Sequence, residues 1–208
     1  MLAERGEMML TRQEADRELE LAGKMNPGAW IDHSRATGQN AELIAKAAGM
    51  DAEKAYCMGL LHDIGRRAGV FAIRHIFEGY YYMNSIGQPE IARICLTHSF
   101  PGGDSRTYFG KYDCMEEEVR FLDEFIGNAE FNDYDRLIQL CDAISLPTGA
   151  CIMEKRLLDV ALRYGVQDFA LSKWRASLEN KKYFDKLCGC NIYTLLPNIV
   201  ENSFANLW

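Results

Sequence analysis

The chain has 208 residues, and 48% of them are hydrophobic, which is enough apolar material for one hydrophobic core. Its formal net charge is −7 at pH 7. Such a surface repels a nucleic-acid backbone, so non-specific binding of DNA or RNA is not expected, although a bound metal can supply local positive charge for a small phosphorylated substrate. No stretch is apolar over the roughly 18 residues of a membrane span, and the N-terminal segment MLAERGEMML lacks the apolar core of a signal peptide.

The cysteines indicate a reducing compartment. There are seven, which is an odd number, and their spacings are irregular. Several lie inside apolar helical runs, such as Cys141 in LIQLCDAI, where a buried thiol fits better than a disulfide framework. We therefore expect a cytoplasmic protein.

Helical signals begin near the N-terminus. The sequence TRQE at 11–14 has the form of a capping box that opens a first helix, which Asn26-Pro27-Gly28 breaks. A second helix is predicted over 29–48, where alanine, leucine and isoleucine recur at helical spacing. Asp51 is suited to cap a third helix, DAEKAYCMGLLHDI, which ends at Gly65.

Helical periodicity continues towards the C-terminus. A short basic turn at 66–69 precedes a helix from 75 to 86, and Pro89 suits the first turn of the next helix, which ends before residue 101. Residues 101–114 are predicted to form a long loop. Further helices are predicted at 115–127, 133–146 (stopped by Pro147), 149–164, 167–179 and 181–204. No run alternates β-branched residues as a strand would, so the predicted fold class is all-α.

The chain has four histidines, which all lie on or at the end of predicted helices: His33, His62, His75 and His98. A single histidine on a helix is usually a capped or surface residue. His62, however, is followed directly by Asp63, and Leu60 and Leu61 should turn this helix into the core. Burying an unpaired charge costs several kcal/mol, so buried His and Asp side chains are normally paired or bound to a metal such as Zn, Fe, Mn or Co.

A second carboxylate near the core is predicted at Asp142. Leu137, Leu140, Cys141 and Ile144 define an apolar face with helical spacing, and Asp142 lies at its rim. Its side chain either hydrogen-bonds a neighbouring helix or binds a metal, and the residues alone favour neither.

The order of these residues resembles a known signature. His33, then His62-Asp63, then Asp142 in the context LxxLCDAI, with an alanine-rich helix after the first histidine, is similar to the HD superfamily of metal-dependent phosphohydrolases. The segment GLLHDIG resembles the central motif of that superfamily closely. The resemblance implies that these four residues bind one metal ion.

The resemblance covers residues 28–146, which is more than half of the chain. It implies an all-α fold of the HD-domain helical-bundle type. The length of the chain favours a single domain over 1–208, with residues 147–208 as additional C-terminal helices outside the motifs of the resemblance. These helices would serve either to form a homodimer or to cap the substrate, and the sequence favours neither role.

The two remaining histidines extend the resemblance to a dinuclear site. In HD proteins with two metals, including a group similar to symmetrical dinucleoside tetraphosphatases, two more histidines lie between the HD pair and the last aspartate. His75 and His98 follow in that order. The resemblance therefore implies six ligands for one or two divalent ions (Fe, Mn, Co, Ni or Zn, with Mg as a further candidate), and Asp63 would bridge them. The additional motif of the branch that cleaves cyclic dinucleotides is not seen.

The implied reaction is hydrolysis of a phosphate ester or anhydride in a small molecule, with a nucleotide as the favoured substrate. A bound metal makes hydroxide available at neutral pH, and phosphoryl transfer then depends mainly on positioning and charge neutralisation. Asp63 and Arg66 are the predicted catalytic residues. Arg66 and Arg67 are also candidates to bind a substrate phosphate, although both suit a solvated turn at a helix C-terminus. Arg35 and Lys111 are weaker substrate-binding candidates, since each also suits an ordinary solvated charge.

Two alternative functions stay open from the sequence. Some proteins of the HD fold with the same six-ligand pattern resemble di-iron oxygenases that cleave carbon–carbon or carbon–phosphorus bonds. A non-catalytic regulatory module that binds a metal or a ligand is the other alternative. An incomplete ligand set is the usual sign of such a module, and the sequence does not show one.

Overall fold

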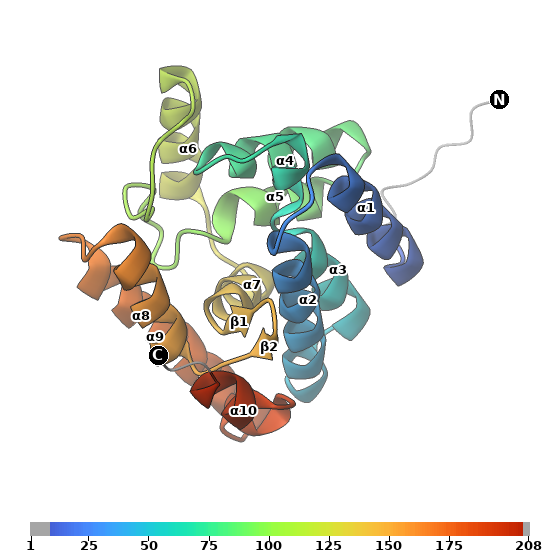
Figure 1. The fold of residues 1–208 in the computed structure, drawn as a ribbon, viewed down its shortest axis with the longest axis vertical. Helices are drawn as coiled ribbons and strands as arrows, with labels where there is room; N and C mark the ends of the chain where they lie inside the picture. Colours follow the sequence, from blue (N-terminus) through green and yellow to red (C-terminus); the bar gives the residue numbers. More distant parts are fainter. Residues whose placement is uncertain (1–8, 206–208) are drawn as a thin grey trace.

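The computed structural model describes residues 9–205 and shows helices arranged around a central α7 (Figure 1). The elements are α1 (Arg12–Met25), α2 (Trp30–Ala47), α3 (Ala52–Leu61), the 3-10 helix η1 (Ile64–Ala68), α4 (Arg74–Ser85), α5 (Pro89–Thr97), α6 (Glu116–Asn128), α7 (Asp133–Ala143), β1 (Ser145–Leu146), β2 (Gly149–Ala150), α8 (Met153–Tyr164), α9 (Ala170–Cys188), the 3-10 helix η2 (Ile192–Leu195) and α10 (Ile199–Phe204). The all-α prediction is confirmed, because the only sheet in the described residues is the small hairpin of β1 and β2.

The helix starts predicted from polar caps are confirmed. Thr11 and Glu14 form the expected reciprocal capping box at the start of α1, where the Glu14 carboxylate accepts from the Thr11 N–H at 2.9 Å. The Asp51 side chain accepts from the Lys54 N–H at 3.0 Å and so begins α3.

Several boundaries differ from the prediction. The third helix ends at Leu61 rather than Gly65, and His62 and Asp63 form a turn before η1. The helix predicted over 133–146 ends at Ala143, because the chain then turns back as an antiparallel hairpin in which Ser145 pairs with Ala150. The predicted break near residue 180 is wrong, since α9 is continuous from Ala170 to Cys188, and the single helix predicted over 181–204 is instead the end of α9, η2 and α10. The helix predicted from residue 149 begins at Met153, after β2. Short-range periodicity could not reveal a hairpin with two residues on each side.

Two glycines allow α2 and α3 to approach at backbone distance. A Cβ atom on Gly59 would lie 2.9 Å from the Cα of Gly38 and 2.9 Å from the Thr37 carbonyl oxygen, so a larger residue would push the helices apart. This contact places His33, in the first turn of α2, beside His62, which follows the end of α3; their ring centroids are 5.3 Å apart.

Gly65 makes a second close approach, between η1 and α4. A Cβ atom there would lie 1.9 Å from the His75 carbonyl oxygen and 2.3 Å from the Gly79 nitrogen. The final glycine of the HDIG sequence is therefore required by packing, and the approach that it permits brings the start of α4 towards Asp63.

The C-terminal helices share the main hydrophobic core. Phe184 of α9 and Ile192 of η2 are fully buried in the same cluster as Leu137 and Leu140 of α7. In α8, by contrast, only Met153 is buried, so this helix packs loosely along the edge of the bundle. The helices α8 and α9 thus lie beside α7, whereas α10 lies against β2 (Figure 1).

Two general expectations can be compared with the fold. All seven cysteines are free, in agreement with the thiols expected from their irregular spacing and apolar helical context. Between residues 9 and 205, no helix has both the length and the apolar character that crossing a bilayer requires. The predicted absence of a signal peptide concerns residues that lie mostly outside the described range.

Candidate metal centre

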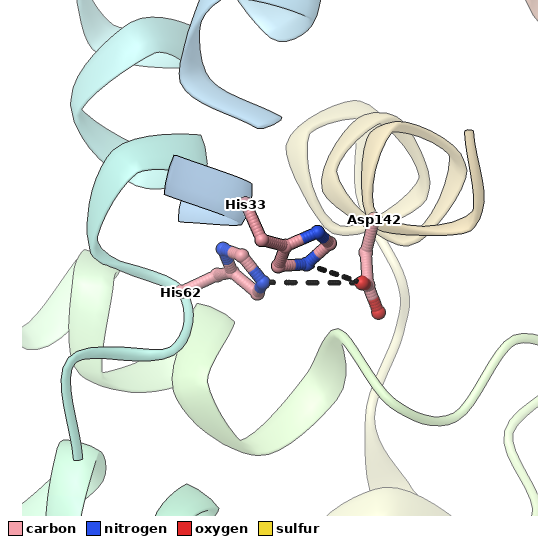
Figure 2. Close-up of side chains that lie close together, drawn as sticks. All are labelled: His33, His62 and Asp142. Atoms are coloured by element: carbon pink, nitrogen blue, oxygen red, sulfur yellow. Dashed lines mark hydrogen bonds and ion pairs between the residues drawn. The ribbon is translucent and has the colours of Figure 1, made fainter. Parts of the chain in front are cut away.

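His33, His62 and Asp142 come together from three different parts of the chain (Figure 2). His33 lies on α2, His62 follows α3, and Asp142 lies in the last turn of α7. The Oδ1 atom of Asp142 lies 3.0 Å from His33 Nε2 and 4.0 Å from His62 Nε2. Two imidazole nitrogens and one carboxylate oxygen at this spacing can be gathered around one divalent transition metal.

A second group of ligand atoms adjoins the first. His62, Asp63 and His98 also place one potential ligand atom each within 4.8 Å of the others. Asp63 Oδ1 lies 3.0 Å from His75 Nε2 and 3.7 Å from His98 Nε2, while its Oδ2 lies 3.9 Å from His62 Nε2. The two carboxylate oxygens of Asp63 therefore face different histidines, as a bridging ligand would.

Backbone carbonyl groups orient three of the four imidazole rings. The Nδ1 atoms of His62, His75 and His98 contact the carbonyl oxygens of Gly59, Ala72 and Ile94, at 2.7 Å for His62 and 3.1 Å for His98. A carbonyl oxygen only accepts, so each Nδ1 must carry the proton. In the neutral rings the Nε2 lone pair is then left for a metal.

The centre contains buried polar atoms that lack hydrogen bonds. His62 and Asp63 are only 1% and 4% exposed. Within the described residues, His62 Nε2 and Asp63 Oδ1 have no hydrogen-bond partner, although charged groups lie near both. Leaving such atoms unsatisfied is costly. A divalent ion would satisfy both atoms, so the residues fit the metal that the sequence implies.

The protonation states also suit metal binding. Burial lowers the pKa of His62, and burial together with the neighbouring His62 ring lowers the pKa of His98 to about 3, so both rings are neutral at pH 7. Burial alone would raise the pKa values of Asp63 and Asp142. For Asp63 the charge of Arg66 together with the neighbouring histidines, and for Asp142 the hydrogen bond from His33 together with the neighbouring histidines, outweigh burial and lower the pKa, so both groups are carboxylates. Metal ligands need these forms.

A second layer of contacts holds α5, and with it His98, against α7. Asp135 is fully buried and accepts from Arg93 Nη2 at 2.8 Å, from Arg93 Nε at 3.0 and 3.1 Å, and from the Thr97 hydroxyl at 2.7 Å. Gln139 donates to the Thr97 carbonyl at 2.9 Å. These polar contacts, which sequence periodicity does not reveal, fix the end of α5 from which His98 projects.

The centre lies in a cavity of about 590 Å³. The residues that line it include five of the six predicted metal ligands, all except His62, together with Arg66. Arg66 Nε donates to Asp63 Oδ2 at 2.6 Å, so this arginine both neutralises Asp63 and reaches the cavity. A cavity of this size accommodates a small-molecule ligand such as a nucleotide.

The other predicted substrate-binding residues do not line this cavity. Arg35 is exposed and pairs with Asp32 on the same helix. Arg67 packs over the Tyr82 ring and contacts the Met25 sulfur. Lys111 lies in the predicted loop but is exposed. Its backbone carbonyl oxygen accepts a hydrogen bond from the Ile73 N–H. The sequence could not exclude these three residues, because local spacing does not define which residues line a cavity built from distant parts of the chain.

Several lining residues were not singled out from the sequence. Tyr108 and Phe109 come from the loop between α5 and α6, while Arg156, Arg163 and Lys173 come from α8 and α9. Both aromatic residues lie in the long loop predicted at 101–114, and that loop was the signal in the sequence that could have identified them. No signal in the sequence linked the C-terminal cations to the histidines, because nothing in local spacing places α8 or α9 beside α7.

Comparison with known proteins agrees with the geometry. A family model described as the HD domain matches residues 30–146, which is more than half of the chain. The chain belongs to the HD-domain family. The matched region includes all six residues of the candidate metal centre and ends four residues after Asp142. Neither the curated proteins nor the solved structures gave a significant match, so the family is shown while the subgroup stays a prediction.

Proposed function

We propose that this HD-domain protein is a metal-dependent phosphohydrolase that cleaves a phosphate ester or anhydride of a small molecule. The observation that carries the proposal is the convergence of four histidines and two aspartates, with unsatisfied buried ligand atoms, beside a cavity of about 590 Å³. A bound divalent ion supplies charge neutralisation and an acidified water for attack at phosphorus.

The residues of the chain have distinct roles in this proposal. His33, His62, Asp63 and Asp142 would hold one ion, and His75 and His98 with Asp63 would hold a second. Arg66, which is half-buried beside Asp63, balances the charge of the shared carboxylate and reaches the cavity wall, where its guanidinium is placed to contact a substrate phosphate.

The favoured substrate class is a nucleotide. The cavity is lined by aromatic side chains, among them Trp30, Tyr108 and Trp174, which offer faces on which a nucleobase can stack. Trp174 Nε1 is buried and has no acceptor within the described part of the chain, so it is available to donate a hydrogen bond to a bound ligand. Within the HD family, we propose the group similar to symmetrical dinucleoside tetraphosphatases as the subgroup whose substrates should be tested first.

The test is phosphate release from nucleotides, dinucleoside polyphosphates and sugar phosphates with added Mn, Fe, Co, Ni or Mg. We expect activity in metal-loaded wild type and a loss of roughly 1,000-fold or more in Asp63→Ala, since that carboxylate contacts both halves of the centre. Asp32→Ala is the matched control, because Asp32 is exposed and adjoins His33 in sequence.

The negative outcomes point to different functions. Full activity in a folded Asp63→Ala protein would remove this residue from the mechanism. No phosphate release from protein shown to contain metal would argue for another function: oxygen consumption by the iron form would then indicate an oxygenase, and its absence a regulatory module.

A further inference from the structure

Three cations on the C-terminal helices line the same cavity as the metal centre. Arg156 and Arg163 lie on α8, and Lys173 lies on α9. We refer to these three residues as the C-terminal wall. The HD-domain match ends at residue 146, so the wall lies outside the matched region.

The charge of the cavity differs in sign from that of the whole chain. Its lining has four cations (Arg66 and the C-terminal wall) and three carboxylates (Asp63, Asp142 and Asp159), which leaves one net positive charge before any histidine is counted. The whole chain has a net charge of −7. Asp63 and Asp142 belong to the metal centre and Arg66 pairs with Asp63. The side of the cavity formed by α8 and α9 thus has three cations against one carboxylate.

Asp159 cannot satisfy both arginines of the wall. Its Oδ2 atom accepts from Arg156 at 3.2 Å and from Arg163 at 2.8 Å. Each guanidinium has five N–H donors. The Nε atom of Arg156 is buried and has no hydrogen-bond partner in the part of the chain that the structure describes. The arginines therefore retain donors for an anionic ligand.

Lys173 adds a half-buried charge to the wall. Its ammonium group donates to the carbonyl oxygens of Ser99 and Thr107, at 2.7 and 2.8 Å. No carboxylate of residues 9–205 lies within ion-pair distance of it. Burial lowers the pKa of Lys173 to about 8, so the group is mostly protonated at pH 7 and keeps one N–H beyond the two carbonyl contacts.

We infer that the C-terminal wall is a second anion-binding subsite, which holds another phosphoryl group of the substrate while the metal centre holds the scissile phosphate. The substrate class is therefore a small molecule with at least two phosphoryl groups. This inference rests on the proposed function for the position of the scissile phosphate. Anion binding by the C-terminal wall can nevertheless be tested without measuring catalysis.

The experiment is calorimetric titration of inorganic tripolyphosphate into the metal-free full-length protein, in a phosphate-free buffer of low ionic strength. We expect saturable binding to wild type and a weakening of roughly tenfold for each of Arg156→Gln and Arg163→Gln. Arg175→Gln is the matched control, because Arg175 is an exposed arginine of α9 outside the cavity lining, and its affinity should equal that of wild type. The arginine variants are preferred to Lys173 variants because Lys173 also holds the backbone of residues 99 and 107.

Either of two results would overturn the inference: no binding of tripolyphosphate to wild type, or equal affinity in wild type and the Arg156→Gln/Arg163→Gln double variant. Steady-state kinetics provides the second measurement. The double variant should raise KM for substrates with two or more phosphoryl groups about 100-fold and leave kcat nearly unchanged. Tripolyphosphate binding without hydrolysis of any phosphorylated compound would contradict the proposed hydrolase and leave the subsite standing.

Discussion

The two sides of the cavity hold their charged groups in different ways. On the HD side, the rings of His62, His75 and His98 are buried, and each is held from behind by a backbone carbonyl group. On the C-terminal side, the arginines lie on a helix that buries one residue, Met153, and they share a single carboxylate. The comparison indicates a rigid side suited to fixed metal geometry and an adjustable side suited to ligands of varied shape.

Gly65→Ala should have the largest effect on the rigid side. The new methyl group would lie 1.9 Å from the His75 carbonyl oxygen, which is backbone and cannot rotate away. We expect the free energy of unfolding to fall by more than about 3 kcal/mol, measured by urea denaturation. Gly127→Ala is the control, because nothing lies within 4 Å of a Cβ atom at that helical position, and it should be neutral or stabilising by up to about 1 kcal/mol. Equal effects of the two substitutions would contradict the close approach.

His62→Ala should weaken metal binding by more than about 100-fold, since His62 belongs to both ligand clusters. The measurement is metal content after dialysis against a weak chelator, by plasma mass spectrometry, with circular dichroism to confirm the helical fold. Arg163→Gln, on the adjustable side, should retain the metal content of wild type. A His62→Ala protein that keeps its metal would exclude His62 from the ligand set.

The stability of the metal-free protein should depend on pH through His98. The pKa of this buried ring is about 3, while an unfolded histidine has a pKa near 6.5. As pH falls from 7 to 5, the unfolded chain takes up a proton that the native state does not bind, so stability falls, by about 2 kcal/mol from His98 alone. Chemical denaturation across this range should show the slope, and His98→Gln should flatten it. A slope unchanged by the substitution would mean that His98 titrates normally.

The smallest effect is expected on the outer face of α8. Leu162 is 79% exposed, so Leu162→Ser should change the free energy of unfolding by less than about 0.5 kcal/mol. Met153→Ala, in the same helix but fully buried, should cost about 2–5 kcal/mol. Thermal or urea unfolding of the two variants compares them directly. A large loss of unfolding free energy for Leu162→Ser would show that this face of α8 is covered. The two sides of the cavity would then differ less in burial than the structure indicates.

Local sequence chemistry determined the helices and much of the candidate centre. The caps at Thr11 and Asp51 and the apolar spacing gave the helix positions, because capping and periodicity act over a few residues. The six His and Asp residues could be predicted as one set only because the HD signature resembles a family pattern; spacing alone left Asp142 undecided. The structure then brought them together.

Tertiary structure alone decided which cations reach the cavity. Arg35 and Lys111 lie close in sequence to the centre or its loop but are exposed, while Lys173 is 75 residues beyond His98 in sequence and donates to the Ser99 carbonyl. The same holds for the ion pair between Arg93 and Asp135, which fixes α5 against α7. Short-range patterns specify which face of a helix is apolar, but the partner of that face depends on the packing of the whole chain, and here that packing brought the C-terminal helices to the metal centre.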